Sequence, residues 1–520
     1  GPDDRQVLVV EASDLARTMR YRSAVDRGRY HVLWASALAD ADELVGRLLT
    51  EVDLERDAVL VVAPYNLPGD RDLTAIALAG PGVRPGYLRS ASTQRAGFLT
   101  LVDVGPTILA RLGVPRPLGM EGRPAEITPD GASLEAKVDR LVSLNAASRF
   151  RERLLVPTTA AAVITMALLL AVAVVLHVSG RVGPWRRWLE AGALTVLAIL
   201  PWSYLARGFP LQDLGIGFYW TFTVLGAAAT AVAAVLLGRQ LDRPRLPLVL
   251  VLSLVVGVLV VDVTTGSRLS LSAAFGYSPT GNSRLYGISN YSYGQLAAAA
   301  FLLAALLVDA RPDRRGRAGA LALLVAVLVV LGVPKWGSDV GGVLAFTPAI
   351  LVFATVLWRW RMRLRTVLIA AGATATAITA FGFLDLARPP EERAHLGRLF
   401  ERVGDEGLGP LLSIMERKLL ANLRVSTSSL WVVAIPLALA FWLYLARGPR
   451  RPVQRLWAAH PTLSAGLAAA TVAAVLGSLV NDSGAIVGGV ASLVLAGSLL
   501  VLLLTDASEP AERDPTEAGA

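Results

Sequence analysis

This 520-residue chain lacks cysteine and a nucleotide-binding loop, and it has very little lysine. Because the chain has no cysteine, it has no disulfide, no thiolate metal site and no thiol nucleophile. Lysine occurs only at positions 137, 335 and 418, so nearly all of the positive charge is arginine. The sequence contains no Walker A motif, which disfavours ATP hydrolysis by this chain. It also shows no internal repeat, which weakens a transporter built from inverted repeats.

Charged residues are scarce as well, at 18% of the chain against ~25% in soluble domains. The formal charge is nevertheless +9, which could indicate a nucleic-acid partner. The arginines, however, gather at the ends of apolar blocks, without the aromatic and basic pattern of a nucleic-acid-binding sheet. We therefore attribute the charge to membrane topology and to the composition of a GC-rich genome, and we expect no nucleic-acid partner.

Apolar blocks of about 20 residues follow one another from Leu155 to Thr505. A helix of about 20 apolar residues has the length that crosses the hydrocarbon core of a bilayer. The sequence therefore predicts a polytopic α-helical membrane protein with about eleven transmembrane helices. The predicted spans are residues 155–179, 188–206, 217–237, 245–262, 292–309, 318–334, 340–358, 365–384, 428–446, 462–480 and 484–504.

Arginine clusters follow every second predicted span. Their members are Arg181, Arg186, Arg187, Arg239, Arg243, Arg245, Arg311, Arg314, Arg315, Arg317, Arg359, Arg361, Arg363, Arg365, Arg447, Arg450, Arg451 and Arg455. Short loops rich in arginine stay on the cytoplasmic side. The pattern predicts a multi-pass plasma-membrane protein with residues 1–150 outside the cell and the C-terminus in the cytoplasm. Since the sequence begins at Gly1 without a signal peptide, we expect an upstream segment that carries residues 1–150 across.

The chain divides into four regions by composition. They are an extracytoplasmic α/β domain over residues 1–130, a helical connector over 131–154, a transmembrane domain over 155–505 and a disordered cytoplasmic tail over 506–520. The transmembrane domain carries two long outer loops, residues 263–290 and 385–427. The longer, polar and glycine-rich loops thus share the outer side, where we expect the function to lie.

Residues 1–130 combine short β-branched runs with helical spacing of apolar residues. The runs at 6–11, 58–63 and 74–78 predict buried strands. Apolar residues at helical spacing predict helices over 39–52 and 98–112, the second of them stopped by the glycine that follows it. The alternation predicts an α/β fold for this part of the chain.

The sharpest local motif is Asp103-Val-Gly-Pro-Thr, followed by Leu112-Gly-Val-Pro and closed by Gly122-Arg-Pro. Asp103 can cap a helix, Pro106 suits its first turn and Gly113 suits its end. The motif resembles the C-terminal segment of the alkaline phosphatase/sulfatase superfamily. The resemblance implies a partial alkaline-phosphatase-like domain, without the half of that fold that carries the nucleophile.

The metal ligands of that superfamily are not matched. Where the family has an Asp-His pair after a strand, this chain has Pro64-Tyr65, and where it has an Asp and a His four residues apart, the chain has Asp14 and Thr18. His31 is the only histidine in residues 1–150. Because a zinc site needs three or four convergent ligands, we expect a degenerate domain with no metal centre and no cofactor. It could bind a phosphorylated headgroup or serve as a scaffold.

In the outer loop 263–290, glycines, tyrosines and hydrogen-bonding groups are concentrated just before a span. Irregular backbone at membrane depth must line a cavity or pack against protein, because lipid cannot satisfy it. Arg284 could bind a phosphate through its planar guanidinium, with Tyr286 and Asn290 beside it. The alternative is an ordinary interfacial loop with its tyrosines in the aromatic belt.

Acidic residues near the outer ends of the spans are the candidates for acid–base chemistry. Asp339 stands among glycines at the start of a span, and ionisable groups at such depth are functional candidates. With Asp262 and Asp482 it could form a cluster that acts as a general base or binds a divalent cation. Asp213 is a weaker candidate. The alternative for each is a solvated carboxylate at a helix end.

The outer segment 385–427 predicts two amphipathic helices that lie on the membrane surface. It resembles the large periplasmic loop of O-antigen ligases and polymerases, in which such residues engage a lipid-linked pyrophosphate. The resemblance implies His395 as a proton acceptor, with Arg393 and Arg398 as phosphate ligands. The alternative is a set of cations over an anionic leaflet.

A phosphatase-like outer domain followed by many spans resembles the phosphoethanolamine transferases of glycolipid anchor synthesis. We therefore expect a protein of cell-envelope assembly that transfers a glycosyl or phosphoryl group to or from a lipid-linked substrate at the outer face. Membrane lipids, a polyprenyl-phosphate-linked glycan and envelope enzymes would be its partners. The alternatives are a non-enzymatic transporter or lipid flippase, and a scaffold that recruits envelope enzymes.

Overall fold

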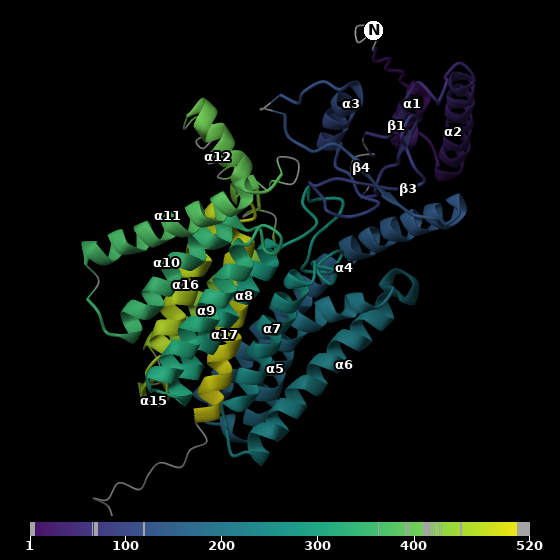
Figure 1. The fold of residues 1–520 in the computed structure, drawn as a ribbon. Coiled ribbons are helices and arrows are strands. Elements are labelled where there is room, and N and C mark those ends of the chain that lie inside the picture. The colour runs from purple at the N-terminus through teal and green to yellow at the C-terminus, as the bar shows by residue number, and fades with distance from the viewer. Residues whose placement is uncertain are drawn as a thin grey trace, which may run out of the picture. The chain divides into compact units, whose positions relative to one another are not determined.

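The chain folds into two units that are described separately. The computed structural model describes residues 6–64, 66, 71–117, 120–361, 363–389, 393, 395–407, 409, 416, 418, 420, 422–425, 427, 429–447 and 450–506. The N-terminal unit is Gly1–Asn145 and the membrane unit is Ala146–Ala520. Figure 1 shows their elements.

The described part of the N-terminal unit contains three complete α-helices, the start of α4 (Leu134–Val178) and two small sheets. Its helices are α1 (Ser13–Arg20), α2 (Arg27–Thr50) and α3 (Val104–Leu112). Its strands pair antiparallel in two separate sheets, β1 (Val59–Val62) with β2 (Ile76–Ala79) and β3 (Gly86–Arg89) with β4 (Glu126–Pro129). Asp26 caps α2 by accepting a hydrogen bond from the Arg29 amide at 3.0 Å.

Most of the elements expected in the N-terminal unit are present, with shifted bounds. The strands expected at 58–63 and 74–78 correspond to β1 and β2, and Gly113 ends α3 in the left-handed conformation, with φ 69°. The strand expected at 6–11 is wrong. These residues pair with no other described segment, and Leu8 and Val9 are 84% and 82% exposed. An apolar run becomes a strand only where a partner can take up its backbone hydrogen bonds.

The Asp103 motif folds back on itself and holds α3 in place. The Asp103 carboxylate is fully buried and accepts hydrogen bonds from the Ser90 hydroxyl and the Arg123 amide, both at 2.7 Å. The Thr107 hydroxyl accepts a further bond from the Ala125 amide at 2.9 Å. Asp103 therefore ties distant segments together and makes no side-chain cap on α3. The resemblance to the phosphatase superfamily stays a prediction.

The membrane unit is a bundle of long apolar helices. They are α4 (Leu134–Val178), which begins in the N-terminal unit, α5 (Val182–Leu205), α6 (Leu211–Gln240), α7 (Leu246–Thr264), α8 (Asn290–Ala310), α9 (Arg314–Gly332), α10 (Val340–Leu357), α11 (Leu364–Leu386), α14 (Trp431–Arg447), α16 (Leu463–Val480) and α17 (Ala485–Asp506). In the part of the chain that the structure describes, 10 of them are long and apolar enough to cross a membrane. The eleventh, α14, has 17 residues. The protein is therefore a polytopic α-helical, multi-pass membrane protein.

Two boundaries of the membrane unit differ from expectation. The connector expected over 131–154 and the first span form one 45-residue helix, α4. No glycine occurs between Gly131 and Gly180, and Pro157, the helix-breaking residue of that stretch, is accommodated inside the helix. At the inner junction before α16, a short helix, α15 (Arg450–Ala459), was not expected. The tail expected over 506–520 lies almost wholly outside the described residues.

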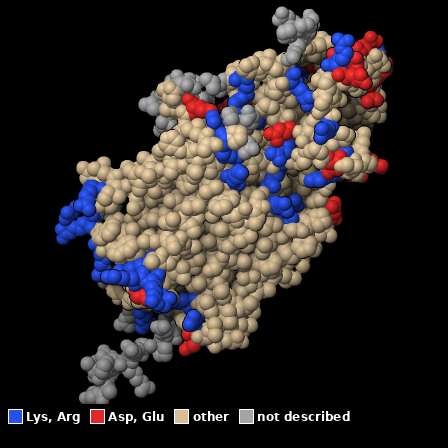
Figure 2. All heavy atoms as spheres, in the orientation of Figure 1, with Lys and Arg blue, Asp and Glu red and all other residues tan. Residues whose placement is uncertain are grey.

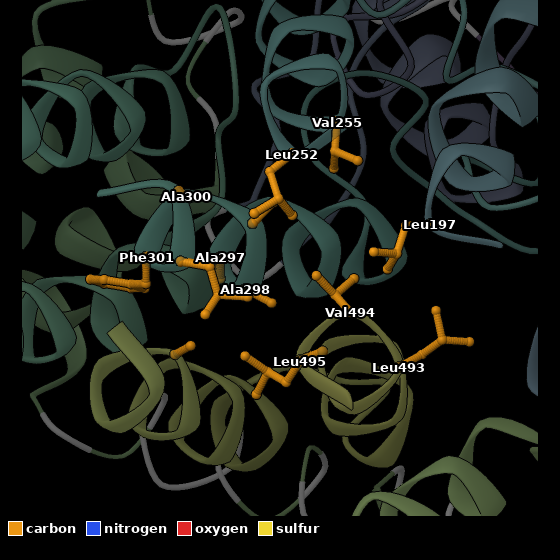
Figure 3. Close-up of a cluster of buried hydrophobic side chains, with 14 of the residues drawn as sticks. Leu197, Leu252, Val255, Ala297, Ala298, Ala300, Phe301, Leu493, Val494 and Leu495 are labelled. Atoms are coloured by element: carbon orange, nitrogen blue, oxygen red, sulfur yellow. The ribbon is translucent and has the colours of Figure 1, made fainter. Parts of the chain in front are cut away.

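The core of the membrane unit forms around α8. This helix packs against α7, α9, α16 and α17, and residues 297–300, all alanine, are at most 1% exposed. Figure 3 shows three of these alanines, Ala297, Ala298 and Ala300, among side chains of α7 and α17, with Leu197 of α5 beside them. Without a hydrophobic driving force between helices in lipid, close packing of small residues supplies the contact energy.

Charged side chains avoid the middle of the membrane unit. Figure 2 shows a broad uncharged belt over its helices, with lysine and arginine gathered at the margin near α15. The belt is typical of a surface that faces hydrocarbon. The orientation expected from the arginine clusters, with the C-terminus in the cytoplasm, stays a prediction, and "outer" below refers to that predicted side.

Candidate functional site

Two outer loops of the membrane unit, 263–290 and 333–339, meet at a pair of glycines. The Ile288 amide donates a hydrogen bond to the Gly337 carbonyl at 3.1 Å. Gly287 has φ 88°, and a β-carbon there would lie 2.2 Å from the Gly337 carbonyl oxygen. The approach of the two backbones therefore requires glycine at position 287.

Arg284 ties these loops together. One terminal nitrogen donates to the carbonyls of Gly337 and Ser338, and the other donates to the Ile288 carbonyl and the Tyr277 hydroxyl, both at 3.1 Å. Both of its terminal nitrogens are thus engaged by the protein. This geometry gives Arg284 a positioning role, and its role as a phosphate ligand stays a prediction.

Tyr286 and Asn290, the other residues predicted to bind substrate in this loop, lie on either side of the glycine contact. Tyr286 is buried, with the Arg284 guanidinium 5.8 Å from its ring centroid, a distance at which a cation is attracted to an aromatic face. Asn290 is half-buried at the first position of α8. Tyr286 thus belongs to the packing around Arg284, and a substrate contact by either residue stays a prediction.

Asp339 stands at the start of α10, directly after the Arg284 contacts. Its Oδ1 atom caps the helix by accepting a hydrogen bond from the Gly342 amide at 3.0 Å. The residue is only 7% exposed. Its Oδ2 atom is buried and has no hydrogen-bond partner among the described residues. A buried carboxylate oxygen without a donor is costly. Asp339 is therefore the candidate with free chemical capacity.

The charges around Asp339 come from three outer segments. Burial raises the pKa of the Asp339 carboxyl above its ordinary value, while the positive charges of Arg284 and Lys418 oppose that rise and the negative charge of Asp482 adds to it. Lys418 itself pairs with Asp482 at 3.4 Å. A raised pKa makes the carboxylate a stronger base than an ordinary aspartate.

The expected cluster of Asp262, Asp339 and Asp482 does not form. Asp262 accepts hydrogen bonds from the Leu269 amide and from the amide and hydroxyl of Ser270, at 2.7, 2.9 and 2.6 Å. Asp482 is 70% exposed. The described residues contain no group of three acidic or histidine side chains that could hold a metal ion. The hypothesis of a divalent cation site at these three carboxylates is therefore wrong, because each serves a different loop.

Asp213, the weaker candidate, is exposed in the first turn of α6. Its carboxylate accepts a hydrogen bond from the side-chain amide of the neighbouring Gln212 at 3.2 Å. It thus fits the alternative of a solvated acid at a helix end.

The outer segment after α11 folds partly as expected. It contains an amphipathic helix, α12 (His395–Glu406), and the second helix expected there lies mostly outside the described residues. Arg393 pairs with Glu401 and donates to the Arg388 carbonyl at 3.0 Å. His395 is the first residue of α12, and its side chain lies outside the described residues. Arg398 is half-buried in the same helix.

A cavity joins α12 to the loop before Asp339. It has a volume of about 10 Å³, and Ser338, Asp385 and Leu396 contribute to its lining together with apolar side chains of α10 and α11. This volume accommodates about one water molecule. The Asp385 carboxylate, fully buried, accepts a hydrogen bond from the Gly397 amide at 2.8 Å. The structure thus brings α12 beside the Asp339 loop, as the site hypothesis requires.

Asn481 is a residue that sequence reasoning did not single out. It follows α16, is 5% exposed, and its side-chain nitrogen has no hydrogen-bond partner among the described residues. Its side-chain oxygen lies 2.1 Å from the position of a β-carbon on Gly341, two residues after Asp339. The available signal was a short polar turn between two apolar spans, opposite a Gly-Gly pair.

Among its described residues, the N-terminal unit supplies no comparable site. His31 is exposed on α2, with its ring 6.4 Å from that of Tyr30, and Asp14 pairs with Arg17. Tyr65 lies outside the described residues. Comparison of the chain with known protein families, curated proteins and solved structures finds no match to any of them.

Proposed function

We propose that this protein acts in assembly of the cell envelope and transfers a glycosyl or phosphoryl group of a lipid-linked substrate at the outer face of the plasma membrane. One observation carries the proposal. Asp339 holds one carboxylate oxygen in a helix cap and leaves the other buried and without a partner. Intramembrane acids of this kind are functional candidates by default.

Group transfer requires a base that takes a proton from the attacking hydroxyl. A carboxylate whose pKa is raised by burial is suited to this step, because it binds a proton more tightly than an ordinary aspartate does. The cap on Oδ1 fixes the carboxyl plane, so Oδ2 is held in one position. Arg284 and Lys418 place positive charge near the same point, where it would stabilise negative charge on a phosphate.

The neighbouring helix fits a substrate that arrives from the bilayer. The amphipathic α12 reaches the cavity beside Ser338 through Leu396. Arg393, Arg398 and His395 lie on or just before this helix, and we assign them the phosphate-binding and proton-accepting roles predicted for them. A lipid-linked phosphate at the membrane surface would meet their cations first.

Replacing Asp339 by asparagine tests the proposal. Asparagine can still cap α10 with its side-chain oxygen, so we expect normal folding but a loss of envelope-product formation of about 100-fold or more. The readout is incorporation of labelled sugar or phosphate into envelope material, in cells whose only copy is the variant. Asp242→Asn, an acid-to-amide change at an exposed inner turn, is the matched control. Unchanged incorporation in the Asp339 variant would refute the proposal.

A transporter or lipid flippase is the second candidate, favoured by the loose packing of α11. Among its described residues only Gly382 and Asp385, both near its C-terminal end, are buried. A helix anchored at one end could move to admit a substrate. Vesicle assays separate the two functions, because a transporter would move labelled lipid-linked substrate across the membrane without forming a product, whatever residue stands at position 395.

A further inference from the structure

Two buried polar atoms without partners flank the first turn of α10. They are Oδ2 of Asp339 and Nδ2 of Asn481, on side chains that are 7% and 5% exposed. A β-carbon on Gly342 would lie 2.4 Å from the first side chain's Oδ2, and one on Gly341 would lie 2.1 Å from the second side chain's oxygen. The carboxylate and the carboxamide thus pack against consecutive glycines, where any side chain would displace them.

Three other aspartates of the membrane unit differ from Asp339 in how their second carboxylate oxygen is engaged. Asp262 has both oxygens in hydrogen bonds, and so has Asp385, which binds the Gly397 amide and Arg388. Oδ1 of Asp309 accepts bonds from Thr462, and Oδ2, which also lacks a hydrogen-bond partner among the described residues, lies 3.7 Å from Nδ1 of His460. Asp339 is therefore distinctive among these carboxylates, because its second oxygen has neither a hydrogen bond nor an ion pair with a described residue.

The two atoms differ in chemical character, and that difference identifies the ligand. Oδ2 of a carboxylate only accepts hydrogen bonds, whereas Nδ2 of a carboxamide only donates them. A bare cation would be repelled by the amide hydrogens, and a bare anion by the carboxylate. A hydroxyl group both donates and accepts, so one oxygen can satisfy both side chains.

We propose that Asp339 and Asn481 form a binding site for a single hydroxyl group, supplied either by water or by an alcohol or sugar. The inference rests on the proposed function, because it names the acceptor of the transferred group. Asn481 is then a residue that positions the acceptor and determines its class. A water in the site would make the protein a hydrolase, and a sugar hydroxyl would make it a transferase.

The reaction step that follows is balanced. The hydroxyl O–H bond breaks as Asp339 Oδ2 takes the proton. The hydroxyl oxygen forms a bond to the phosphorus or anomeric carbon of the lipid-linked donor, and the bond from that atom to its leaving oxygen breaks. The leaving group departs with the electron pair and takes a proton, which returns Asp339 to its ionised form. Asn481 holds the oxygen throughout through its N–H donor.

Exchange of the two side chains tests the site. The single variants Asp339→Asn and Asn481→Asp leave two amides or two carboxylates, whereas the double variant restores one donor and one acceptor in reversed positions. The probe is water, observed in the full chain in lipid nanodiscs as an infrared O–H band that shifts in H₂¹⁸O. We expect the band in the wild type and the double variant, with at least about tenfold less intensity in each single variant, since loss of a charge-assisted partner weakens binding by that order.

Glycerol, added as a small polyol, distinguishes the two sources of the hydroxyl. Displacement of the water band by glycerol identifies an alcohol or sugar acceptor, and a band that resists glycerol identifies water as the acceptor. Asn481→Leu replaces the amide by an apolar side chain of similar size and stands in if the second aspartate prevents folding. Asp242→Asn serves as the control and should keep the band.

Two results would overturn the inference. One is a wild type without an exchangeable band that depends on position 339. The other is a band that persists at full intensity in the single variants Asn481→Asp or Asn481→Leu. Product formation, measured separately, distinguishes this failure from that of the proposed function. If changing Asn481 abolishes product but leaves the band unaltered, the hydroxyl site is removed and the proposed function stands. If Asp339→Asn loses the band but forms product normally, the hydroxyl site stands and the proposed function is removed.

Discussion

Asp262 and Asp339 are the same residue type at the outer ends of two spans, and both are buried, at 3% and 7% exposure. Asp262 accepts three hydrogen bonds from the loop that follows it, and Asp339 accepts one from its own helix. The difference comes from the next residues of the chain. A loop that turns back supplies two amides and a hydroxyl to Asp262, while the first turn of α10 supplies only the Gly342 amide to Asp339. Burial alone therefore does not identify a functional acid, and the count of its hydrogen-bond donors does.

The largest expected effect comes from breaking the link between these two regions. Arg284→Ala leaves four acceptors in the joined loops without their donor, so we expect a loss of about 3–5 kcal/mol of unfolding free energy. The measurement is unfolding by SDS titration in mixed micelles. Arg268→Ala, an exposed arginine of the same loop, is the control. Equal stability of the two variants would mean that Arg284 does not hold the loops.

The next largest effect is expected at Asp262, the aspartate with hydrogen bonds to both carboxylate oxygens. Asp262→Asn places an N–H group against the Ser270 or Leu269 amide and leaves a buried donor without an acceptor, so we expect a loss of about 2–3 kcal/mol in the same titration. Asp482→Asn, at an exposed position, should cost less than about 0.5 kcal/mol. An Asp262 variant as stable as the wild type would show that the hydrogen bonds of Asp262 do not stabilise the fold.

A smaller change sharpens the same point. Ser270→Ala removes one of the three donors to Asp262, a hydroxyl bond of 2.6 Å, and leaves the two amide bonds in place. We expect a loss of about 1 kcal/mol. Ser283→Ala, an exposed serine in the same loop, provides the reference. If the two serine variants have the same unfolding free energy, the bond from the Ser270 hydroxyl to Asp262 does not stabilise the protein.

The smallest effect on stability is expected at Asp339, and it depends on pH. Because the pKa of Asp339 is raised in the folded protein, the folded state binds the proton more tightly than the unfolded chain. That stabilisation is fully present below the ordinary carboxyl pKa and is lost as the pH rises through the raised value. Asp339→Asn should therefore match the wild type within about 0.5 kcal/mol in acid and gain on it towards neutral pH.

Thermal unfolding in nanodiscs between about pH 4, close to the ordinary carboxyl pKa, and about pH 7.5 measures this difference. Asp242→Asn, at an exposed turn, should run parallel to the wild type across the range. A stability difference between Asp339→Asn and the wild type that does not change with pH would show that the buried carboxyl does not titrate there.

The spans could be read from the sequence because they depend on local length and apolarity. Helix bounds moved where a single local feature intervened, as at Asp26, which starts α2 earlier than expected. The strand expected at residues 6–11 failed because pairing is not a local property. At the site, the proximity of Arg284 to Asp339 agrees with the expectation that outer loops share one place.

The roles within the site could not be read from the sequence. Whether a carboxylate is saturated depends on where the backbone of a neighbouring loop points its amides, as Asp262 illustrates. The contact of Asn481 with Gly341 joins two helices that are far apart in the sequence. No periodicity or short motif encodes such a meeting.

The run of alanines in the middle of α8 has a consequence for how this protein can change over time. Each of these positions is enclosed by neighbouring helices, so even one added methyl group would force a partner helix outward. On α11, whose side chains are mostly uncovered, one apolar residue can replace another with little loss. Substitutions should therefore accumulate on α11 and be purged from α8, so the central helix would be the most faithful sequence marker of this architecture.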